Sequence, residues 1–361
     1  MRFALSDDQK MLQDSLAKAL AEVSPLERVR RFADDPEDAA EDVWRGLADY
    51  GLPGIVIPEA HGGLGLGMLE AALASEALGA AVAPVAFLGA VLAPLALMRG
   101  GSDAQKTEWL PRLASGEVQA ALAISEAVAG ARDGAGLTAK GGKLSGKALF
   151  VPGGLGAGLI VAADTAGALH LVRGDAAGLT RSPMPGIDAT RRLAELTFAD
   201  TPAEPLESNE GLGALRDAGW VILAADTLGA AQAMLDKAVA YAKERRQFGR
   251  VIGSFQAVKH LCAEMAAELE PARALVWYAA YAFDHAPEEA SLMAAHAKAH
   301  TSEIGRFIAR TSTEVHGGIG ITDLLGLHHW FKRSGLNRQL LGGPEKVREY
   351  AARTQGLVGA S

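Results

Sequence analysis

The order in which helical and strand-like apolar patterns follow one another along this sequence most constrains its fold. Apolar residues recur at helical spacing from about residue 6 to 116, and again from about 212 to the end. Between them lie short apolar runs separated by Gly, Pro and Asp clusters, which is typical of a small β domain. We therefore predict an α+β protein with an N-terminal helical domain (residues 1–117), a middle β domain (118–205) and a C-terminal helical bundle (206–361).

Local signals support this division. Ser6 with Gln9 three residues on has the spacing of a helix capping box. One face of a long helix is predicted from apolar residues that begin at Phe255 and end at Leu269. Four strands are predicted in the middle region, at Ala148–Val151, Leu159–Ala163, Leu169–Val172 and Leu193–Phe198.

Charge and composition exclude several classes of protein. A net charge of −8 lacks the basic footprint of a nucleic-acid-binding surface. The apolar stretch Ala80–Met98 is interrupted by Pro84, Gly89 and Pro94, so we predict a buried helix and a connection, and not a membrane span. Cys262 is the only cysteine, and the N-terminus lacks a secretory signal, so we expect a cytoplasmic protein. No metal site is predicted.

Two motifs near the C-terminal helices suit a dinucleotide. Arg246 and Phe248 precede Gly249, where a guanidinium can form forked hydrogen bonds to phosphate oxygens. The glycines of His316–Gly320 let backbone amides approach a phosphate or ribose. Each motif alone is equally compatible with a surface cation or a simple turn. Together, with Gln256 between them, they indicate a flavin dinucleotide.

Four stretches give the chain a family resemblance. They are Gly62–Gly65 after Pro58, Gly101–Glu117, Glu244–Met265 and Ser312–Thr322. In sequence, order and separation they resemble the acyl-CoA dehydrogenases over essentially the whole chain. The resemblance implies a middle domain that is β-barrel-like, a C-terminal four-helix bundle, FAD as cofactor, α,β-oxidation of an acyl-CoA thioester, and an electron-transfer flavoprotein as acceptor.

The resemblance also implies which residues serve the flavin. In the family, the C-terminal motifs contact FAD held mainly by the neighbouring subunit, while the middle domain lines the flavin of its own subunit. The matching positions here are Arg246, Phe248, Gln256, Glu314, Gly317, Gly318, Ser125 and Phe150. Glu314 stands where family members often have Gln, and Phe150 is expected to replace a flavin-covering aromatic residue.

The catalytic base of the family is missing from both of its usual places. A carboxylate there removes the α proton of the substrate, and it is found either in a turn near the C-terminus or on the first helix of the bundle. The matching positions are Gly342 and Gly219. Nearby carboxylates are weak substitutes: Asp217 lies on a different helix face, Asp226 is expected to be buried, and Glu345 is expected in the first turn of a helix.

The missing or altered residues are those that a family member uses in its own active site. The motifs that contact the flavin of the neighbouring subunit are intact. The strand with Phe150 also carries Pro152, and the loop after Glu126 is short. We therefore hypothesise a base-lacking subunit that completes the flavin site of a second acyl-CoA dehydrogenase-like chain, as in heteromeric members of sterol side-chain catabolism. The alternatives are an active homo-oligomer with a relocated carboxylate, a flavin-dependent monooxygenase, and a non-catalytic acyl-CoA-binding scaffold.

Overall fold

The N-terminal part of the computed structural model is helical, and the model describes residues 4–207 and 211–358. Its helices are α1 (Asp7–Val23), α2 (Leu26–Asp34), α3 (Glu41–Ala48), α4 (Met68–Ala80), α5 (Phe87–Gly100) and α6 (Asp103–Ala114). Ser6 caps α1 with Gln9 in the predicted capping box, and Ser102 caps α6 in the same way. The predicted buried helix is confirmed as α5, which is buried along most of its length, and the residues between α4 and α5 form the predicted connection.

The middle part consists of two four-stranded sheets. The strands are β1 (Ala120–Ala123), β2 (Gly136–Lys140), β3 (Lys143–Pro152), β4 (Leu159–Ala163), β5 (Leu169–Arg173), β6 (Leu179–Met184), β7 (Leu193–Pro202) and β8 (Glu204–Pro205). One sheet has the order β1-β4-β5-β8 and the other β2-β3-β7-β6. Apart from the parallel pair β1–β4, neighbouring strands are antiparallel. Inward side chains of both sheets, such as Ile160 and Phe198, share one apolar cluster.

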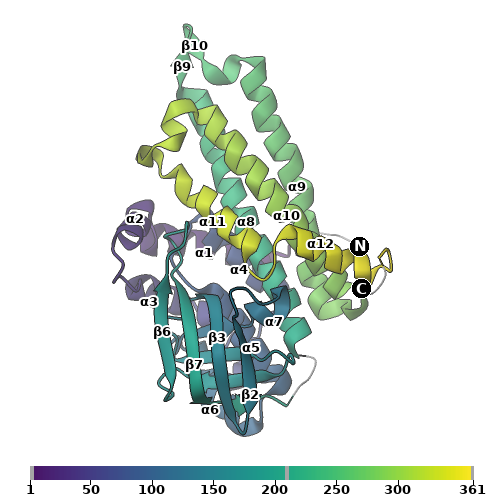
Figure 1. The fold of residues 1–361 in the computed structure, drawn as a ribbon. Helices are drawn as coiled ribbons and strands as arrows, with labels where there is room; N and C mark the ends of the chain where they lie inside the picture. The colour runs from purple at the N-terminus through teal and green to yellow at the C-terminus, as the bar shows by residue number, and fades with distance from the viewer. Residues whose placement is uncertain (1–3, 208–210, 359–361) are drawn as a thin grey trace.

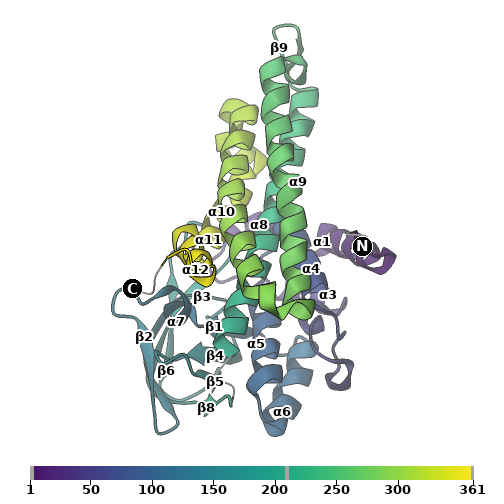
Figure 2. The ribbon, with the colours of Figure 1, turned by 90° about the vertical axis from the view of Figure 1, so that its right-hand side faces the viewer.

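The C-terminal part is a bundle of long helices that projects away from the sheets (Figures 1 and 2). Its elements are α8 (Gly211–Glu244), α9 (Gln256–His285), α10 (Pro287–His316), α11 (Leu327–Gln339) and α12 (Pro344–Thr354). Helix α8 is apolar enough to span a membrane, but 89% of its most apolar window is buried inside the protein. It is therefore the core helix of the bundle.

Glycines set how closely α8 packs against α4. A Cβ atom on Gly79 would lie 2.0 Å from the carbonyl oxygen of Asp226, and one on Gly229 would lie 1.8 Å from that of Glu76. Real Cβ atoms never come so close to backbone, so each helix needs glycine where it meets the other. This close crossing joins the N-terminal helices to the bundle.

A buried polar network joins the bundle to the β domain. The fully buried Arg333 of α11 donates from Nε to Asp188 Oδ2 (2.9 Å) and from Nη1 to Asp226 Oδ2 (3.3 Å). Its Nη2 donates to Thr190 Oγ1 (2.6 Å). Arg191 adds a second cation, donating to Asp226 Oδ2 at 2.6 Å. The network fixes the loop before β7 against α8 and α11, and this loop forms one wall of the cavity described below.

Candidate cofactor edge and base positions

The hairpin between α8 and α9 holds an aromatic side chain out in solvent. Strands β9 (Arg246–Gln247) and β10 (Arg250–Val251) pair antiparallel at the far end of the bundle (Figure 2). Both residues between them have positive φ, 51° at Phe248 and 79° at Gly249, as in the tight turns of two-residue hairpins. Phe248 is 90% exposed. Its ring meets that of Phe255 edge-on, 6.2 Å between centroids, but most of the aromatic surface is left to solvent on a left-handed backbone.

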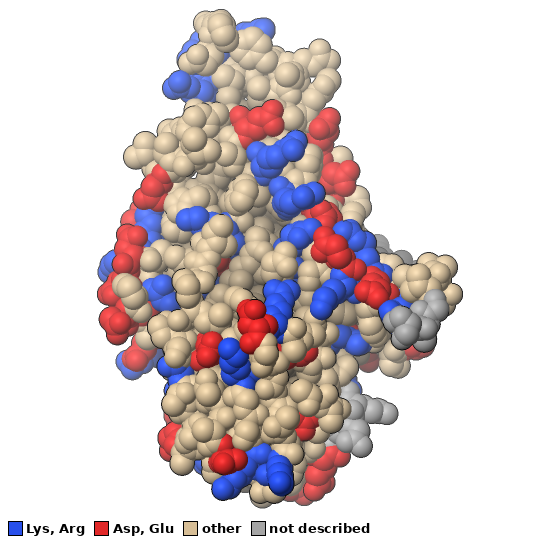
Figure 3. Space-filling view, in the orientation of Figure 1, with Lys and Arg blue, Asp and Glu red and all other residues tan. Residues whose placement is uncertain are grey.

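Cations surround that turn. Arg245, Arg246 and Arg250 are all exposed, and Figure 3 shows this end of the molecule in tan and blue. Arg246 Nη2 donates to the carbonyl oxygen of Gly249 at 3.2 Å, which orients the guanidinium while leaving it in solvent. The guanidinium of Arg250 stacks on Phe255, 4.0 Å from the ring centroid. Gln256 is exposed at the first residue of α9.

The late glycine motif lies at the same end of the bundle. Helix α10 ends at His316, whose ring lies 4.8 Å from that of Tyr241 near the end of α8. A Cβ atom on Gly317 or Gly318 would meet nothing within 4 Å. Gly317 has φ +63°, but Gly318 has neither a positive φ nor a close neighbour among the described residues, none of which therefore requires it to be glycine. Glu314 is exposed in the last turn of α10.

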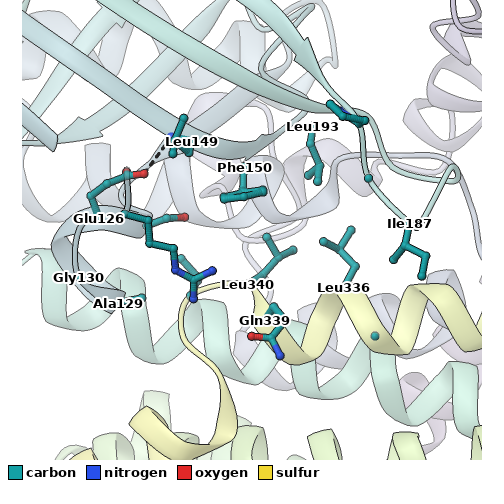
Figure 4. Close-up of a pocket in the computed structure, with 16 residues that line it drawn as sticks. Glu126, Ala129, Gly130, Leu149, Phe150, Ile187, Leu193, Leu336, Gln339 and Leu340 are labelled. Atoms are coloured by element: carbon teal, nitrogen blue, oxygen red, sulfur yellow. Dashed lines mark hydrogen bonds between the residues drawn. The ribbon is translucent and has the colours of Figure 1, made fainter. Parts of the chain in front are cut away.

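A separate cavity of about 280 Å³ lies between the β domain and α11 (Figure 4). It is smaller than the roughly 300–1,000 Å³ of ordinary ligand pockets. Ser125, at the start of the short helix α7 (Ser125–Ala129), lines it. So does Phe150, which sits where the pairing of β3 with β7 shifts register and has φ +55°. Such a bulge re-aims a side chain, and here it directs Phe150 at the cavity.

Glu126, the residue after Ser125, also lines this cavity. Its Oε1 accepts a hydrogen bond from the backbone nitrogen of Leu149 at 2.9 Å (Figure 4). Burial raises the pKa of Glu126 above the usual carboxyl range, and the hydrogen bond from Leu149 opposes that rise in part. Of the described residues that line the cavity, Glu126 is the only carboxylate.

Leu341 lies next to both glycines at the expected base positions. A Cβ atom on Gly219 would lie 2.4 Å from Cδ1 of Leu341, the residue just before Gly342. Leu341 is 4% exposed, has φ +55° and lines the cavity, and its carbonyl oxygen accepts a hydrogen bond from Trp220 Nε1 at 2.9 Å. Gly342 has φ +106°, a conformation that only glycine adopts readily. A leucine side chain therefore occupies the space beside Gly219.

Two family models and several relatives match this chain. The model described as acyl-CoA dehydrogenase, N-terminal domain, matches residues 6–117, and the model described as acyl-CoA dehydrogenase, C-terminal domain, matches residues 218–355. Acyl-CoA dehydrogenase IpdE2 of Mycolicibacterium smegmatis is 33% identical, covering 96% of this chain and 99% of that protein. IpdE2 of Mycobacterium tuberculosis is 34% identical, covering 94% of this chain and 95% of that protein.

The chain belongs to the acyl-CoA dehydrogenase family.

Solved structures agree with this assignment. A chain of the Tcur3481–Tcur3483 steroid ACAD has a TM-score of 0.89 at 30% identity and covers 97% of this chain and 98% of that one. A chain of the ChsE4–ChsE5 complex from Mycobacterium tuberculosis has a TM-score of 0.91 at 25% identity, covering all of both chains. The predicted three-part fold is confirmed, and FAD is the cofactor of this acyl-CoA dehydrogenase family.

The three candidate substitute carboxylates each have hydrogen-bond or ion-pair partners within this chain. Asp217 accepts from Arg216 Nε at 2.8 Å and from the hydroxyl of Ser291. Asp226 is 1% exposed, as predicted, and besides its two arginine partners it accepts from Asn337 Nδ2 at 2.6 Å.

Glu345 lies in the first turn of α12, as predicted, and pairs on the surface with Arg338 at 3.1 Å. The pKa of Asp217 is raised by burial, whereas that of Glu345 is lowered by the N-terminal backbone of α12. None of the three carboxylates lines the cavity.

The two regions therefore differ in how well they fit the family cofactor. The edge formed by the hairpin and the glycine motif offers exposed guanidinium groups and unobstructed backbone, which suits an adenosine diphosphate group. The cavity, lined by Phe150, Leu340 and Leu341 among others, has a volume of about 280 Å³, which is small for a flavin ring together with an acyl thioester.

Proposed function

We propose that this chain is the base-lacking subunit of a hetero-oligomeric, FAD-dependent acyl-CoA dehydrogenase that oxidises the α,β bond of a CoA thioester. One observation carries the proposal: Leu341 fills the space beside Gly219, and Gly342 supplies no carboxylate from the adjoining turn. A base at either position would need a carboxylate in a water-poor slot. The chain has an apolar side chain there instead.

The edge at the far end of the bundle has the opposite character. Arg246 would hold the diphosphate, Phe248 and Gln256 would contact the adenosine part, and Gly317 and Gly318 would allow close backbone approach. FAD, when bound, supplies the acceptor for the hydride that leaves the β carbon. All five residues are exposed, so in a complex they would reach a cofactor on the neighbouring subunit. Glu314 would lie at the rim of this contact.

Ser125 and Phe150 would then line what remains of this chain's own cofactor position. Phe150 points into the cavity among apolar side chains, and no hydroxyl follows it on β3, since Val151 and Pro152 come next. Phe150 would cover the flavin ring, but Val151 and Pro152 have no side-chain donor for a hydrogen bond to it. The arrangement supports a chain that does not complete the chemistry on its own.

The relatives suggest the partner and the substrate class. Two of the similar solved structures carry paired names, Tcur3481–Tcur3483 and ChsE4–ChsE5, and the first is called a steroid ACAD. We extend this to a second acyl-CoA dehydrogenase-like subunit for this protein, to a steroid-derived or other bulky acyl-CoA as substrate, and to an electron-transfer flavoprotein as acceptor. We place the complex in the cytoplasm.

Reduction by acyl-CoA tests the proposal. The chain would be purified alone and co-expressed with a dehydrogenase-like chain encoded beside it that retains a glutamate at one of the two base positions. We expect bleaching of the flavin by acyl-CoA from the co-expressed pair and none from this chain alone. Bleaching by this chain without a partner would contradict the proposal.

A second candidate, an active homo-oligomer, is favoured by one observation. Glu126 faces the cavity with a pKa raised by burial, as expected for a carboxylate that is to act as a base. Its hydrogen bond to Leu149 gives it a structural role as well. In a homo-oligomer, Glu126→Gln would abolish turnover while leaving flavin bound.

A further inference from the structure

A cluster of two histidines and an aspartate lies beyond the glycine motif, in a part of the chain for which the sequence predicts no metal. Asp323 begins the short 3-10 helix η5 (Asp323–Leu325), and His328 and His329 lie in the first turn of α11. Gly326, with φ +63°, turns the chain between the two elements. One nitrogen or oxygen atom from each of the three side chains lies within 4.8 Å of the other two.

The imidazole of His329 provides an independent observation. His329 is 5% exposed, and its Nε2 atom is buried without a hydrogen-bond partner among the described residues. Buried polar atoms in proteins are nearly always paired, and an unpaired one commonly marks the place of a water or an ion. The neighbouring His328 ring lies 4.1 Å away, and His328 Nε2 lies 3.6 Å from Asp323 Oδ1.

The chemistry of these three side chains suits a transition metal. Imidazole nitrogen and carboxylate oxygen are the ligands of Zn²⁺ and its neighbours in the first row, and imidazole must be neutral to bind. Ligand atoms 2.0–2.1 Å from a tetrahedral ion are about 3.4 Å apart, so the cluster would contract by about 1.4 Å at most.

We propose that Asp323, His328 and His329 bind one divalent transition-metal ion of the zinc class. The side chain of His328 is 26% exposed and that of Asp323 is 77% exposed, so the ion enters from solvent and keeps a position open for water. Bound there, it fixes η5 to α11 directly after the glycine motif. The site does not depend on the proposed dehydrogenase role.

Two cations limit the affinity. Arg30 Nη2 donates to the carbonyl oxygens of Asp323 and Leu324 at 2.6 and 3.0 Å, which holds the same turn, and Lys332 follows on α11. Their charges oppose a dication, and the start of a helix also disfavours one. We therefore expect a dissociation constant in the micromolar range, weaker than that of closed structural zinc sites.

Metal titration tests the site. The full-length chain is stripped with a chelator, then titrated with Co²⁺ in the visible region and with Zn²⁺ in a calorimeter. We expect one ion per chain, with the intense visible bands of low-coordinate Co²⁺. Asp323→Ala changes an exposed side chain and His328→Ala a partly exposed one, so folding should survive, and each should weaken binding at least tenfold.

His300→Ala is the matched control. His296 and His300 are spaced i,i+4 on α10 and form the competing surface pair. The proposal predicts unchanged binding in His300→Ala. Absence of binding in the native chain, native affinity in both cluster variants, or loss of binding in His300→Ala would overturn it.

Discussion

The far end of the bundle and the cavity at its base differ in what their residues do for this chain. At the far end, Phe248 is 90% exposed on a left-handed backbone and Gly318 has no neighbour that requires glycine. Leu341, which lines the cavity, is buried with its carbonyl oxygen hydrogen-bonded, and Asp226 and Arg333 are buried and paired in the adjoining network. The residues of the first region are placed to bind a group outside this chain, and those of the second stabilise the fold. Substitutions should therefore affect binding in one and folding in the other.

The largest effect is expected from Arg333→Met in the buried network. It leaves Asp188 and Asp226 with one cation fewer in the interior, and removing one partner of a buried ion pair costs about 3–5 kcal/mol. Denaturant unfolding measures the loss of free energy. Arg45→Met is the control, since its pair with Glu41 is exposed on α3 and is worth about 0.3–0.5 kcal/mol. Equal losses in both variants would break the comparison.

Arg246→Met should show the reverse pattern. Removing a charged donor to a phosphate weakens flavin binding by the co-expressed pair by about 1.5–3 kcal/mol, which is about ten- to 150-fold. The free energy of unfolding of the chain should not change, since the side chain is exposed. Flavin fluorescence on dilution gives the affinity, and Arg45→Met again serves as the control with one positive charge removed. Unchanged flavin affinity in Arg246→Met would contradict the proposal that the far end of the bundle binds FAD.

Two glycine substitutions sharpen the account of the filled base position. Gly219→Ala forces a methyl group against Leu341 and should destabilise the chain by about 1–3 kcal/mol through overpacking. Gly335→Ala, inside α11, meets nothing within 4 Å and should stabilise it by about 0.5–1 kcal/mol. Thermal unfolding compares them. If Gly219→Ala were as stable as the parent chain, Leu341 would not fill this space.

The smallest effect is expected from Glu126→Gln. Turnover and flavin content of the pair should not change, because Gln can still accept the hydrogen bond from Leu149.

The same variant has a pH signature. Since the pKa of Glu126 is raised in the folded protein, the folded state holds its proton more tightly than the unfolded chain. The stability that results is present below the ordinary carboxyl pKa and is lost as pH rises through the raised one. Glu126→Gln should lack that loss in urea titrations across mildly acidic pH. Loss of turnover in this variant would instead favour the active homo-oligomer.

Strands with strong apolar patterns could be predicted from the sequence, and the others could not. The four predicted runs lie within β3, β4, β5 and β7, which are the inner strands of both sheets. The edge strands β2 and β6 were missed, because one face of each meets water and their side chains are mostly polar or exposed. Strand β1 is Ala120–Ala123, which has little β propensity and becomes a strand by pairing with β4 and packing under α5.

The candidate site divides in the same way. Arg246 and the glycine motif could be predicted as flavin contacts because each lies in a short, recognisable stretch of sequence. The position of Leu341 beside Gly219 depends on how a turn with positive φ meets a distant helix, and no local pattern reveals such a contact. The Arg333 network was missed for the same reason, since it joins segments far apart in the chain.

The flavin-to-chain ratio of the purified hetero-oligomer tests the central claim most directly. If this chain lends its far end to a partner and has no working cavity of its own, the complex should contain one FAD for each pair of chains, and this chain purified alone should contain none. One FAD for every chain, or a full complement in this chain alone, would contradict the account.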